Sequence, residues 1–363
     1  MRKKKKTTVS YQQIFLSLLT VLLSLIGLFF VFESSVAESF AKYSHPYHFL
    51  RQQSMWFMIG VALMFFTSLI PSKLWLKTAP LWYIFSLILL VLVFIPGIGL
   101  EINGAHRWIK IGPANGQPIE FVKFALVIFY ASWMSKHQRL TPFLFLTAIP
   151  VLLLLLQPDM GSLLILLSIA FGMYYLSGGD FKKILAVSLA GVFFLALMIL
   201  TSSYRLRRLK TFLNPEADPL GASFHIRQIT LALGSGGWLG QGLGNSKQKF
   251  YYIPEASSDS IFAIIGEEIG FLGSMLLLLL FISYFNLIYE IALKAKNRSF
   301  AQLVAFGVLL WVSSQTLLNL AAVVALVPLT GLPLPFFSYG GSSLVMVFLA
   351  TGVVLRIAKE NRA

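Results

Sequence analysis

Carboxylates gather in one short stretch of this 363-residue chain. Glu255, Asp259, Glu267 and Glu268 lie within 14 residues, where polar sequence gives way to a long apolar run. Asp259 stands where a helix N-cap would stand, but a cap explains neither Glu255 before it nor the adjacent pair two turns later. Partial removal from water raises the pKa of a carboxyl group and suits it to accept a proton. Asp259, at the edge of the apolar run, is therefore the best candidate for a general base.

Two further sets of ionisable residues lie at the edges of apolar runs, where charge is expensive unless it faces a partner or a cavity. Glu120 and Lys123 are i,i+3 neighbours that follow Pro118, a residue suited to a helix start. They form either a structural ion pair or part of a polar cavity. Asp159 follows Pro158, which suits either a helix N-terminus or a polar group opening into an outward cavity.

Three other motifs lie in connecting segments. Arg and Lys cluster at 205–210, either as an anchor for lipid headgroups or as a contact for pyrophosphate. The glycine-rich stretch 234–244 fits neither nucleotide-binding fingerprint and predicts a turn-rich loop whose backbone can approach a ligand. Prolines and glycines in 328–343 exclude a regular helix, so we expect this segment to dip back against the rest of the protein.

The elements that position these residues follow from composition. Hydrophobic residues make up 57% of the chain and charged residues 12%, which excludes a soluble globular protein and a disordered chain. The chain has no cysteine, so disulfides, thiolate metal sites and cysteine nucleophiles are excluded. We expect an all-α polytopic membrane protein with ten transmembrane helices, near residues 14–32, 53–70, 80–96, 118–135, 142–157, 160–176, 183–201, 261–290, 301–327 and 341–357.

The distribution of positive charge predicts the orientation. If the N-terminus is cytoplasmic, 17 of the 29 Lys and Arg fall in cytoplasmic segments and 4 in the short outer loops. Both termini are then cytoplasmic, residues 1–10 form a basic cytoplasmic tail, and residues 202–260 form one long extracytoplasmic loop between the seventh and eighth spans. The formal charge of +15 therefore records orientation and does not indicate nucleic-acid binding. We expect residues 1–363 to form a single membrane domain.

Several of these motifs occur together, and in order, in one known family. The chain resembles the SEDS family (shape, elongation, division and sporulation), and is most similar to its FtsW and SpoVE branch. The resemblance covers nearly the whole chain, and each motif is weak alone while the ordered set is specific. The matching residues are 103–109, 117–120, 123, 157–161, 214–215, 218–221, 242–249, 254–255, 259, 261–263, 267–271 and 331–341.

The resemblance implies a peptidoglycan glycosyltransferase that polymerises lipid II at the outer face of the bacterial cytoplasmic membrane. It implies that Asp259 is catalytic and takes the proton from the 4-hydroxyl of the acceptor lipid II. The acceptor oxygen then displaces undecaprenyl pyrophosphate from the donor with inversion. Cationic side chains or a divalent cation, Mg or Mn, should stabilise the leaving group. The remaining candidates for substrate binding are Arg107, Lys123, Glu120 as the residue that orients Lys123, Asp159, Glu255 and Glu267.

The sequence departs from the family at three positions, and these leave the details of packing open. Ile119 stands where the family commonly has Ser, Ser260 replaces the usual Phe after the catalytic Asp, and His106 replaces Arg or Ser. Residues 247–252 resemble the division branch, whereas residues 215–219 resemble the RodA branch. We expect a division role at the septum, with an elongation or sporulation paralogue of the same chemistry as the alternative.

Two other functions compete with polymerisation. A lipid II flippase would depend on charges deep among the helices, and a scaffold would only recruit division proteins. Asp259 near the surface favours chemistry over transport. The expected partners are lipid II, undecaprenyl pyrophosphate, a monofunctional class B penicillin-binding protein, other divisome proteins and membrane lipids, with no nucleic acid.

Overall fold

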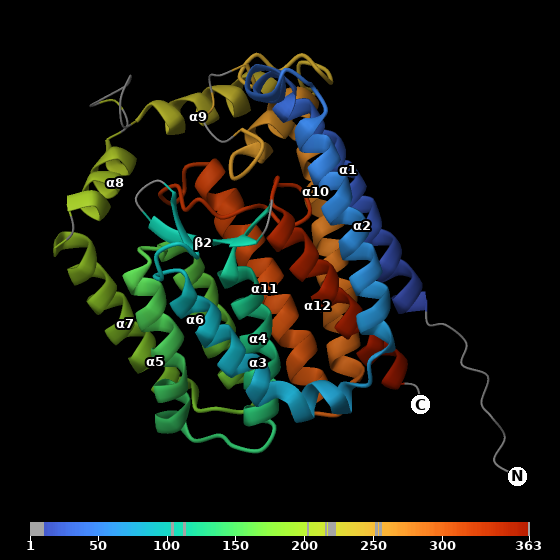
Figure 1. Cartoon of the computed structure of the whole chain (residues 1–363), viewed down its shortest axis with the longest axis vertical. Helices are drawn as coiled ribbons and strands as arrows, with labels where there is room; N and C mark the ends of the chain where they lie inside the picture. The colour runs from blue at the N-terminus through green and yellow to red at the C-terminus, as the bar shows by residue number, and fades with distance from the viewer. Residues whose placement is uncertain are drawn as a thin grey trace, which may run out of the picture.

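The computed structural model describes residues 11–102, 105–111, 114–201, 203–214, 216, 223–250, 253 and 256–361. The expected basic tail and Glu255 lie outside these residues. Most of the described chain is helical (Figure 1). The helices are α1 Tyr11–Tyr43, α2 His48–Leu69, α3 Ser72–Leu92, α4 Pro118–Met134, α5 Leu140–Leu156, α6 Met160–Leu176, α7 Phe181–Thr201, α8 Ser203–Leu213, α9 Phe224–Gly236, α10 Ile261–Lys294, α11 Phe300–Val323 and α12 Gly341–Glu360.

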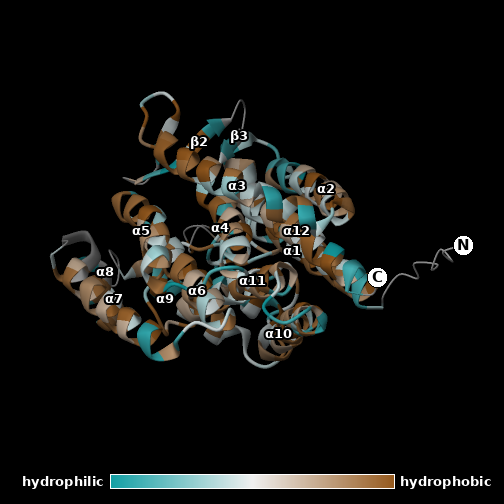
Figure 2. Cartoon of the chain, turned by 90° about the horizontal axis from the view of Figure 1, so that it is seen from below, coloured by the Kyte–Doolittle hydropathy of each residue, from teal (hydrophilic) through white to brown (hydrophobic). Residues whose placement is uncertain are grey.

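Each of the ten expected apolar stretches coincides with a helix. Seven of the described helices, α1, α2, α3, α7, α10, α11 and α12, are long and apolar enough to cross a membrane, and α5 and α6 are shorter apolar helices. Hydrophobic residues also cover peripheral helices such as α5 and α7 (Figure 2). On α7, for example, Leu189, Val192 and Phe193 are all exposed. An apolar outer surface of this kind is suited to lipid and not to water.

The all-α prediction is wrong in one segment. Three antiparallel strands, β1 Gly99–Ile102, β2 Ala105–Ile111 and β3 Ala114–Gly116, form a small sheet in the order β1-β2-β3. In β2, Ala105 and Ile109 are buried while His106 and Lys110 are exposed, so one face of the strand packs on the protein and the other faces outward. The sequence at 103–104 is Asn-Gly, the pair most typical of a two-residue hairpin turn, and this signal went unused in the sequence interpretation.

The segment expected as a plain extracytoplasmic loop also contains helices. α8 and α9 lie between α7 and α10, and α9 runs across one end of the bundle, above the sheet (Figure 1). Ile226, Ile229 and Ala232 of α9 are buried. Because these apolar residues recur every three residues, α9 packs one face on the protein.

The centre of the bundle is formed by α4, α11 and α12. α4 is buried on nearly every side, and its residues include the fully buried Phe124 and Tyr130. Trp311 of α11 and Phe348 of α12 are also fully buried. A helix that is apolar all round is expected to be surrounded by other helices. The polar tip of Tyr130 is satisfied, since its hydroxyl donates to Thr147 Oγ1 at 3.0 Å.

A kink at Gly270 divides α10 into a short and a long part. Gly270 has φ +67°, which an L side chain rarely adopts, and a Cβ there would lie 2.2 Å from the backbone nitrogen of Gly240. The kink frees the carbonyls of Glu267 and Glu268, which accept hydrogen bonds from the backbone N–H groups of Gln241 and Gly242 at 2.9 and 3.0 Å. The glycine-rich stretch is therefore a packed turn against α10.

Candidate functional site

Asp259 lies in the turn that leads into α10, at the end of the bundle covered by α9. Its backbone carbonyl accepts a hydrogen bond from Asn319 Nδ2 of α11 at 2.8 Å, and the same amide nitrogen donates to the Leu332 carbonyl at 2.7 Å. Asn319 thus ties the turn before α10 to the proline-rich segment. Ser260 Oγ donates to Asp259 Oδ1 at 3.3 Å. The side chain of Asp259 is half-buried, as suits a group that must meet both protein and substrate.

The proline- and glycine-rich segment completes the surroundings of Asp259. A Cβ at Gly331, where φ is +69°, would lie 3.9 Å from Asp259 Oδ2. The backbone N–H of Tyr339 donates to the Ser257 carbonyl at 2.7 Å. Leu332 and Leu334 are buried. This irregular segment is therefore packed within the protein, as its composition predicted.

Glu120 and Lys123 form a buried ion pair on α4. Lys123 Nζ donates to Glu120 Oε1 at 2.7 Å and to Gln315 Oε1 of α11 at 2.6 Å, and it lies 5.4 Å from the centre of the Trp311 ring. Gln315 Nε2 in turn donates to the Pro333 carbonyl at 2.9 Å. The ion pair is thus connected to the proline-rich segment through Gln315. This arrangement corresponds to the structural alternative, and substrate contact by either residue stays a prediction.

Asp159 and Arg107 meet at the turn between α5 and α6. Asp159 caps α6, because its oxygens accept from the Ser162 backbone N–H at 3.1 Å and the Ser162 hydroxyl at 2.8 Å. The Arg107 guanidinium, carried by β2, donates to the carbonyls of Gln157 and Pro158. The small sheet therefore positions a partly exposed arginine beside the helix turn. Asp159 makes a structural cap, and its role towards substrate stays a prediction.

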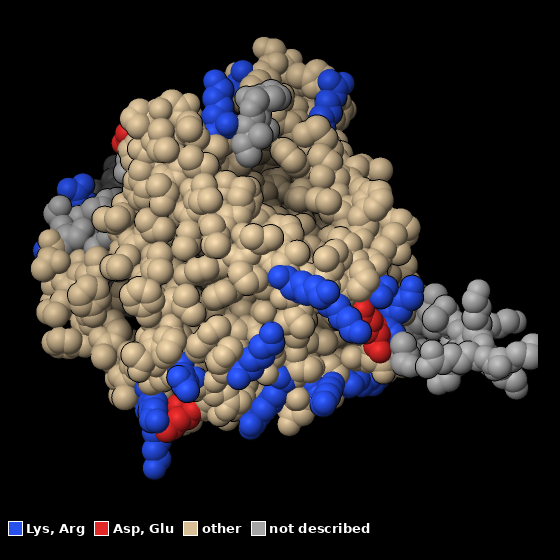
Figure 3. Space-filling view, turned by 60° about the horizontal axis from the view of Figure 1, so that its bottom comes forward, with Lys and Arg blue, Asp and Glu red and all other residues tan. Residues whose placement is uncertain are grey.

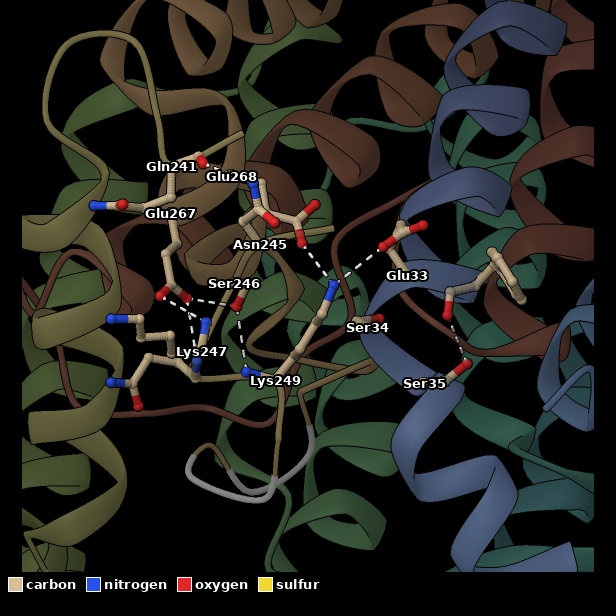
Figure 4. Close-up of polar contacts among 12 residues, drawn as sticks. Glu33, Ser34, Ser35, Gln241, Asn245, Ser246, Lys247, Lys249, Glu267 and Glu268 are labelled. Atoms are coloured by element: carbon tan, nitrogen blue, oxygen red, sulfur yellow. Dashed lines mark hydrogen bonds and ion pairs between the residues drawn. The ribbon is translucent and has the colours of Figure 1, made fainter. Parts of the chain in front are cut away.

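Glu267 and Glu268 bind the segment that precedes the site (Figure 4). Glu267 accepts from the Ser246 hydroxyl at 2.5 Å and from the Lys247 backbone N–H at 3.0 Å. Lys249 Nζ lies between two carboxylates, 2.9 Å from Glu268 and 3.1 Å from Glu33 of α1. The two adjacent carboxylates thus have separate partners.

The three described carboxylates therefore have different partners: Asp259 contacts Ser260, Glu267 contacts Ser246, and Glu268 contacts Lys249. Glu255 is outside the described residues. Sequence reasoning missed Lys249 as the partner of Glu268, and Glu33 as the second carboxylate that contacts Lys249. Glu33 carried one unused signal, since it follows directly on an apolar run that crosses the membrane.

The remaining candidates are a basic cluster and a metal site. Arg207 and Lys210 of α8 are exposed, while the side chains of Arg205 and Arg208 lie outside the described part of the chain. Within the described residues there is no group of three or more His, Cys, Asp or Glu that could hold a metal ion. Magnesium often binds through one or two carboxylates together with substrate phosphates, so the divalent cation stays a prediction.

Comparison with known proteins identifies the class to which this fold and site belong. The sequence profile of the FtsW, RodA and SpoVE family, described as "Cell cycle protein", matches residues 13–363. The chain belongs to this family of membrane proteins, which confirms the resemblance inferred from the motifs.

Relatives of known name match along almost their whole length. Stage V sporulation protein E of Bacillus subtilis is 36% identical, with 99% of each chain covered. The probable peptidoglycan glycosyltransferase FtsW of Trichlorobacter lovleyi is 38% identical, over 98% of this chain and 95% of the relative.

Two solved structures share the fold. A chain from a structure described as "Structural coordination of polymerization and crosslinking by a peptidoglycan synthase complex" superposes with a TM-score of 0.79 and 28% identity, over 98% of both chains. The rod shape determining protein RodA of Thermus thermophilus gives a TM-score of 0.70 and 27% identity, also over 98% of both chains.

Proposed function

We propose that this chain is a glycosyltransferase that polymerises lipid II into glycan strands during septal wall synthesis. Its FtsW relatives carry the name of probable peptidoglycan glycosyltransferases, which supports this class of reaction. The observation that carries the proposal is the setting of Asp259. This half-buried carboxylate lies where α9, the start of α10 and the proline-rich segment meet, and Ser260 and Asn319 hold its side chain and backbone.

The proposed reaction is a single displacement. Asp259 accepts the proton of the 4-hydroxyl of the acceptor lipid II, and the acceptor oxygen attacks the anomeric carbon of the donor. The new glycosidic bond forms as the bond from that carbon to the pyrophosphate oxygen breaks. Undecaprenyl pyrophosphate leaves with the bonding electron pair, and attack from the opposite side inverts the anomeric centre. A carboxylate that accepts the proton in this way contributes a factor of about 10²–10⁴ to the rate.

Arg107 is the proposed contact for the leaving pyrophosphate. Its planar guanidinium has five N–H donors, and two contacts to carbonyls at 157 and 158 fix its direction. Lys123 is fully buried, so we assign it a positioning role through Gln315 and the Pro333 carbonyl, with Glu120 orienting its amine. A divalent cation, Mg or Mn, would supply further positive charge at the phosphates.

We further propose ten membrane spans with both termini in the cytoplasm and residues 202–260 on the outer side. The start of α1 and the end of α12 lie at the same end of the bundle, where Gln13 Nε2 donates to the Leu355 carbonyl at 3.1 Å. Lys and Arg gather near that end (Figure 3). The start of α3 also lies there, because the Ser72 backbone N–H donates to Glu360 of α12, and the nearby Lys73 and Lys77 are exposed. This distribution is typical of a cytoplasmic face. The site at Asp259 lies at the opposite end, which the proposal assigns to the outside of the cell.

The partner is proposed to be a monofunctional class B penicillin-binding protein. The structural relative from a peptidoglycan synthase complex supports this pairing, because that complex couples polymerisation with crosslinking. We propose that the chain works in the cytoplasmic membrane at the septum, together with other divisome proteins.

The proposal is tested by two assays on the purified full chain with its partner synthase. Wild type and Asp259→Ala are compared for polymerisation of labelled lipid II on gels and for lipid II translocation in proteoliposomes. Glu38→Gln is the matched control, because this glutamate forms a solvent-exposed i,i+4 pair with Lys42 at 2.6 Å. We expect polymer from wild type and the control and none from Asp259→Ala. Translocation that persists in Asp259→Ala, with no polymer from wild type, would favour a flippase.

A further inference from the structure

A histidine of α9 reaches the site through the serine that follows Asp259. His225 Nε2 lies 2.8 Å from Ser260 Oγ, and Ser260 Oγ lies 3.3 Å from Asp259 Oδ1. Ser260 is fully buried and His225 is half-buried. The three polar groups form a continuous chain from α9 to the carboxylate. Neither His225 nor Ser260 was among the residues predicted to act at the site.

An ionised Asp259 sets a preferred direction for the hydrogen bonds of this chain. An ionised carboxylate only accepts hydrogen bonds, so the single hydroxyl proton of Ser260 points to Asp259 Oδ1. With that proton directed to Asp259, the serine oxygen accepts from the histidine in the tautomer that carries its proton on Nε2. The order is therefore His225 Nε2–H to Ser260 Oγ–H to Asp259 Oδ1.

We propose that His225 and Ser260 are positioning residues that orient the Asp259 carboxylate for proton transfer. The proposal rests on the function proposed above. Ser260 holds Oδ1, while Oδ2 lies on the side of Gly331 and the proline-rich segment. Rotation of the carboxylate about its last bond would exchange the two oxygens, and the hydrogen bond from Ser260 opposes that rotation.

The rest of the structure holds the histidine in place. His225 lies in the first turn of α9, directly before the buried Ile226, and Ile229, about one turn further on, is also buried. Asn319 fixes the backbone of Asp259 from the opposite side, at its carbonyl. Both ends of the chain of hydrogen bonds are thus anchored, and the hydrogen bond from the Ser260 hydroxyl restrains the side-chain torsion of Asp259.

Ser260 is also one of the three positions named above at which the sequence departs from the family it resembles, where phenylalanine is usual. A phenylalanine there has no hydrogen-bonding group, so it can neither donate to Asp259 nor accept from a histidine. The chain from His225 to Asp259 therefore depends on the serine at position 260. In this chain the Ser260 hydroxyl orients the neighbouring Asp259 carboxylate.

The experiment compares lipid II polymerisation rates of the full chain with its partner synthase. Ser260→Ala and His225→Ala each remove one link. We expect each to lower kcat by about tenfold while KM changes less than about twofold, because misorientation affects the chemical step more than binding. His225→Gln keeps a donor near the position of Nε2 and should recover most of the loss, and Ser260→Thr keeps the hydroxyl and should do the same. Thr230→Ala is the matched control, since its hydroxyl is exposed on α9 and donates only to the Ile226 carbonyl of its own helix.

The double variant separates positioning from a general loss of structure. If the two residues act through one chain, Ser260→Ala/His225→Ala should lose no more than either single variant. Wild-type kcat in the single variants would overturn the inference, as would losses that multiply in the double variant or no recovery with His225→Gln. The thermal midpoint of each variant is measured alongside, and a fall in kcat that only follows the midpoint also overturns it. Full activity of Asp259→Asn would instead refute the proposed function itself.

Discussion

Replacement of Lys123 by methionine tests the buried ion pair at the centre of the bundle. The side chains of Lys123 and Glu120 are 0% and 2% exposed, and Lys123 Nζ lies 2.7 Å from Glu120 Oε1. Lys123→Met keeps the length of the side chain and removes its charge. The Glu120 carboxylate then stays buried without its cation, and Gln315 Oε1 loses a donor that lies 2.6 Å away.

The magnitude follows from the burial of both partners. Since neither side chain reaches solvent, screening does not weaken the pair. Removing one member of a buried pair costs about 3–5 kcal/mol, whereas replacing both members by neutral groups is often close to neutral. We therefore expect Lys123→Met to lower the free energy of unfolding by about 4 kcal/mol. The double variant Glu120→Gln/Lys123→Met should regain most of this loss.

The assay is equilibrium unfolding of the full chain in mixed micelles with increasing SDS, followed by tryptophan fluorescence. Lys42→Met is the matched control, because its pair with Glu38 is exposed and should contribute less than about 1 kcal/mol. The reasoning would be refuted if Lys123→Met unfolds within about 1 kcal/mol of wild type. It would equally be refuted if the double variant is as unstable as the single one.

Three other substitutions test the parts that support the site. Gly270→Ala should destabilise the protein by about 3 kcal/mol, because φ is +67° and the facing backbone lies 2.2 Å from the new Cβ. The control is Gly191→Ala on α7, where nothing lies within 4 Å of the new Cβ. It should be neutral or slightly stabilising in the same unfolding assay. Lys249→Met should lower the free energy of unfolding by about 3 kcal/mol, because the fully buried Glu268 loses its cation. Adding Glu268→Gln to this variant should restore much of the lost stability. Equal stability of the single and double variants would contradict this reasoning. Asn319→Leu removes two hydrogen bonds, of 2.8 and 2.7 Å, and should lower the free energy of unfolding by about 2 kcal/mol. We also expect kcat to fall. Unchanged polymerisation kinetics would show that the amide is not needed.

The helices could be predicted from the sequence because apolar runs of membrane length leave few alternatives. Every expected stretch coincides with a helix, and Asp259 lies just before α10, at the edge of the apolar run, as the sequence indicated. The small sheet was missed, although Asn103-Gly104 carried a hairpin signal. α9 was missed because its buried face carries only three apolar side chains, Ile226, Ile229 and Ala232, within a polar, glycine-rich segment.

The partners of buried charges could not be predicted, since they come from distant parts of the chain. Glu268 pairs with Lys249, which in turn contacts Glu33 of α1. Gln315 contacts Lys123 across 192 residues, and no local pattern reveals such a contact. The i,i+3 pair of Glu120 and Lys123 was predictable because both residues lie on one helix face.

The most direct test of the central claim is the rate of lipid II polymerisation by Asp259→Asn beside wild type, with equal thermal midpoints and the same partner synthase. Asparagine preserves the shape of the side chain and its ability to accept from Ser260, but it cannot take the acceptor proton. If Asp259 is the general base, kcat falls by a factor of about 10²–10⁴. A rate within about twofold of wild type would contradict the assignment, because a lost proton acceptor must slow the chemical step by far more than that.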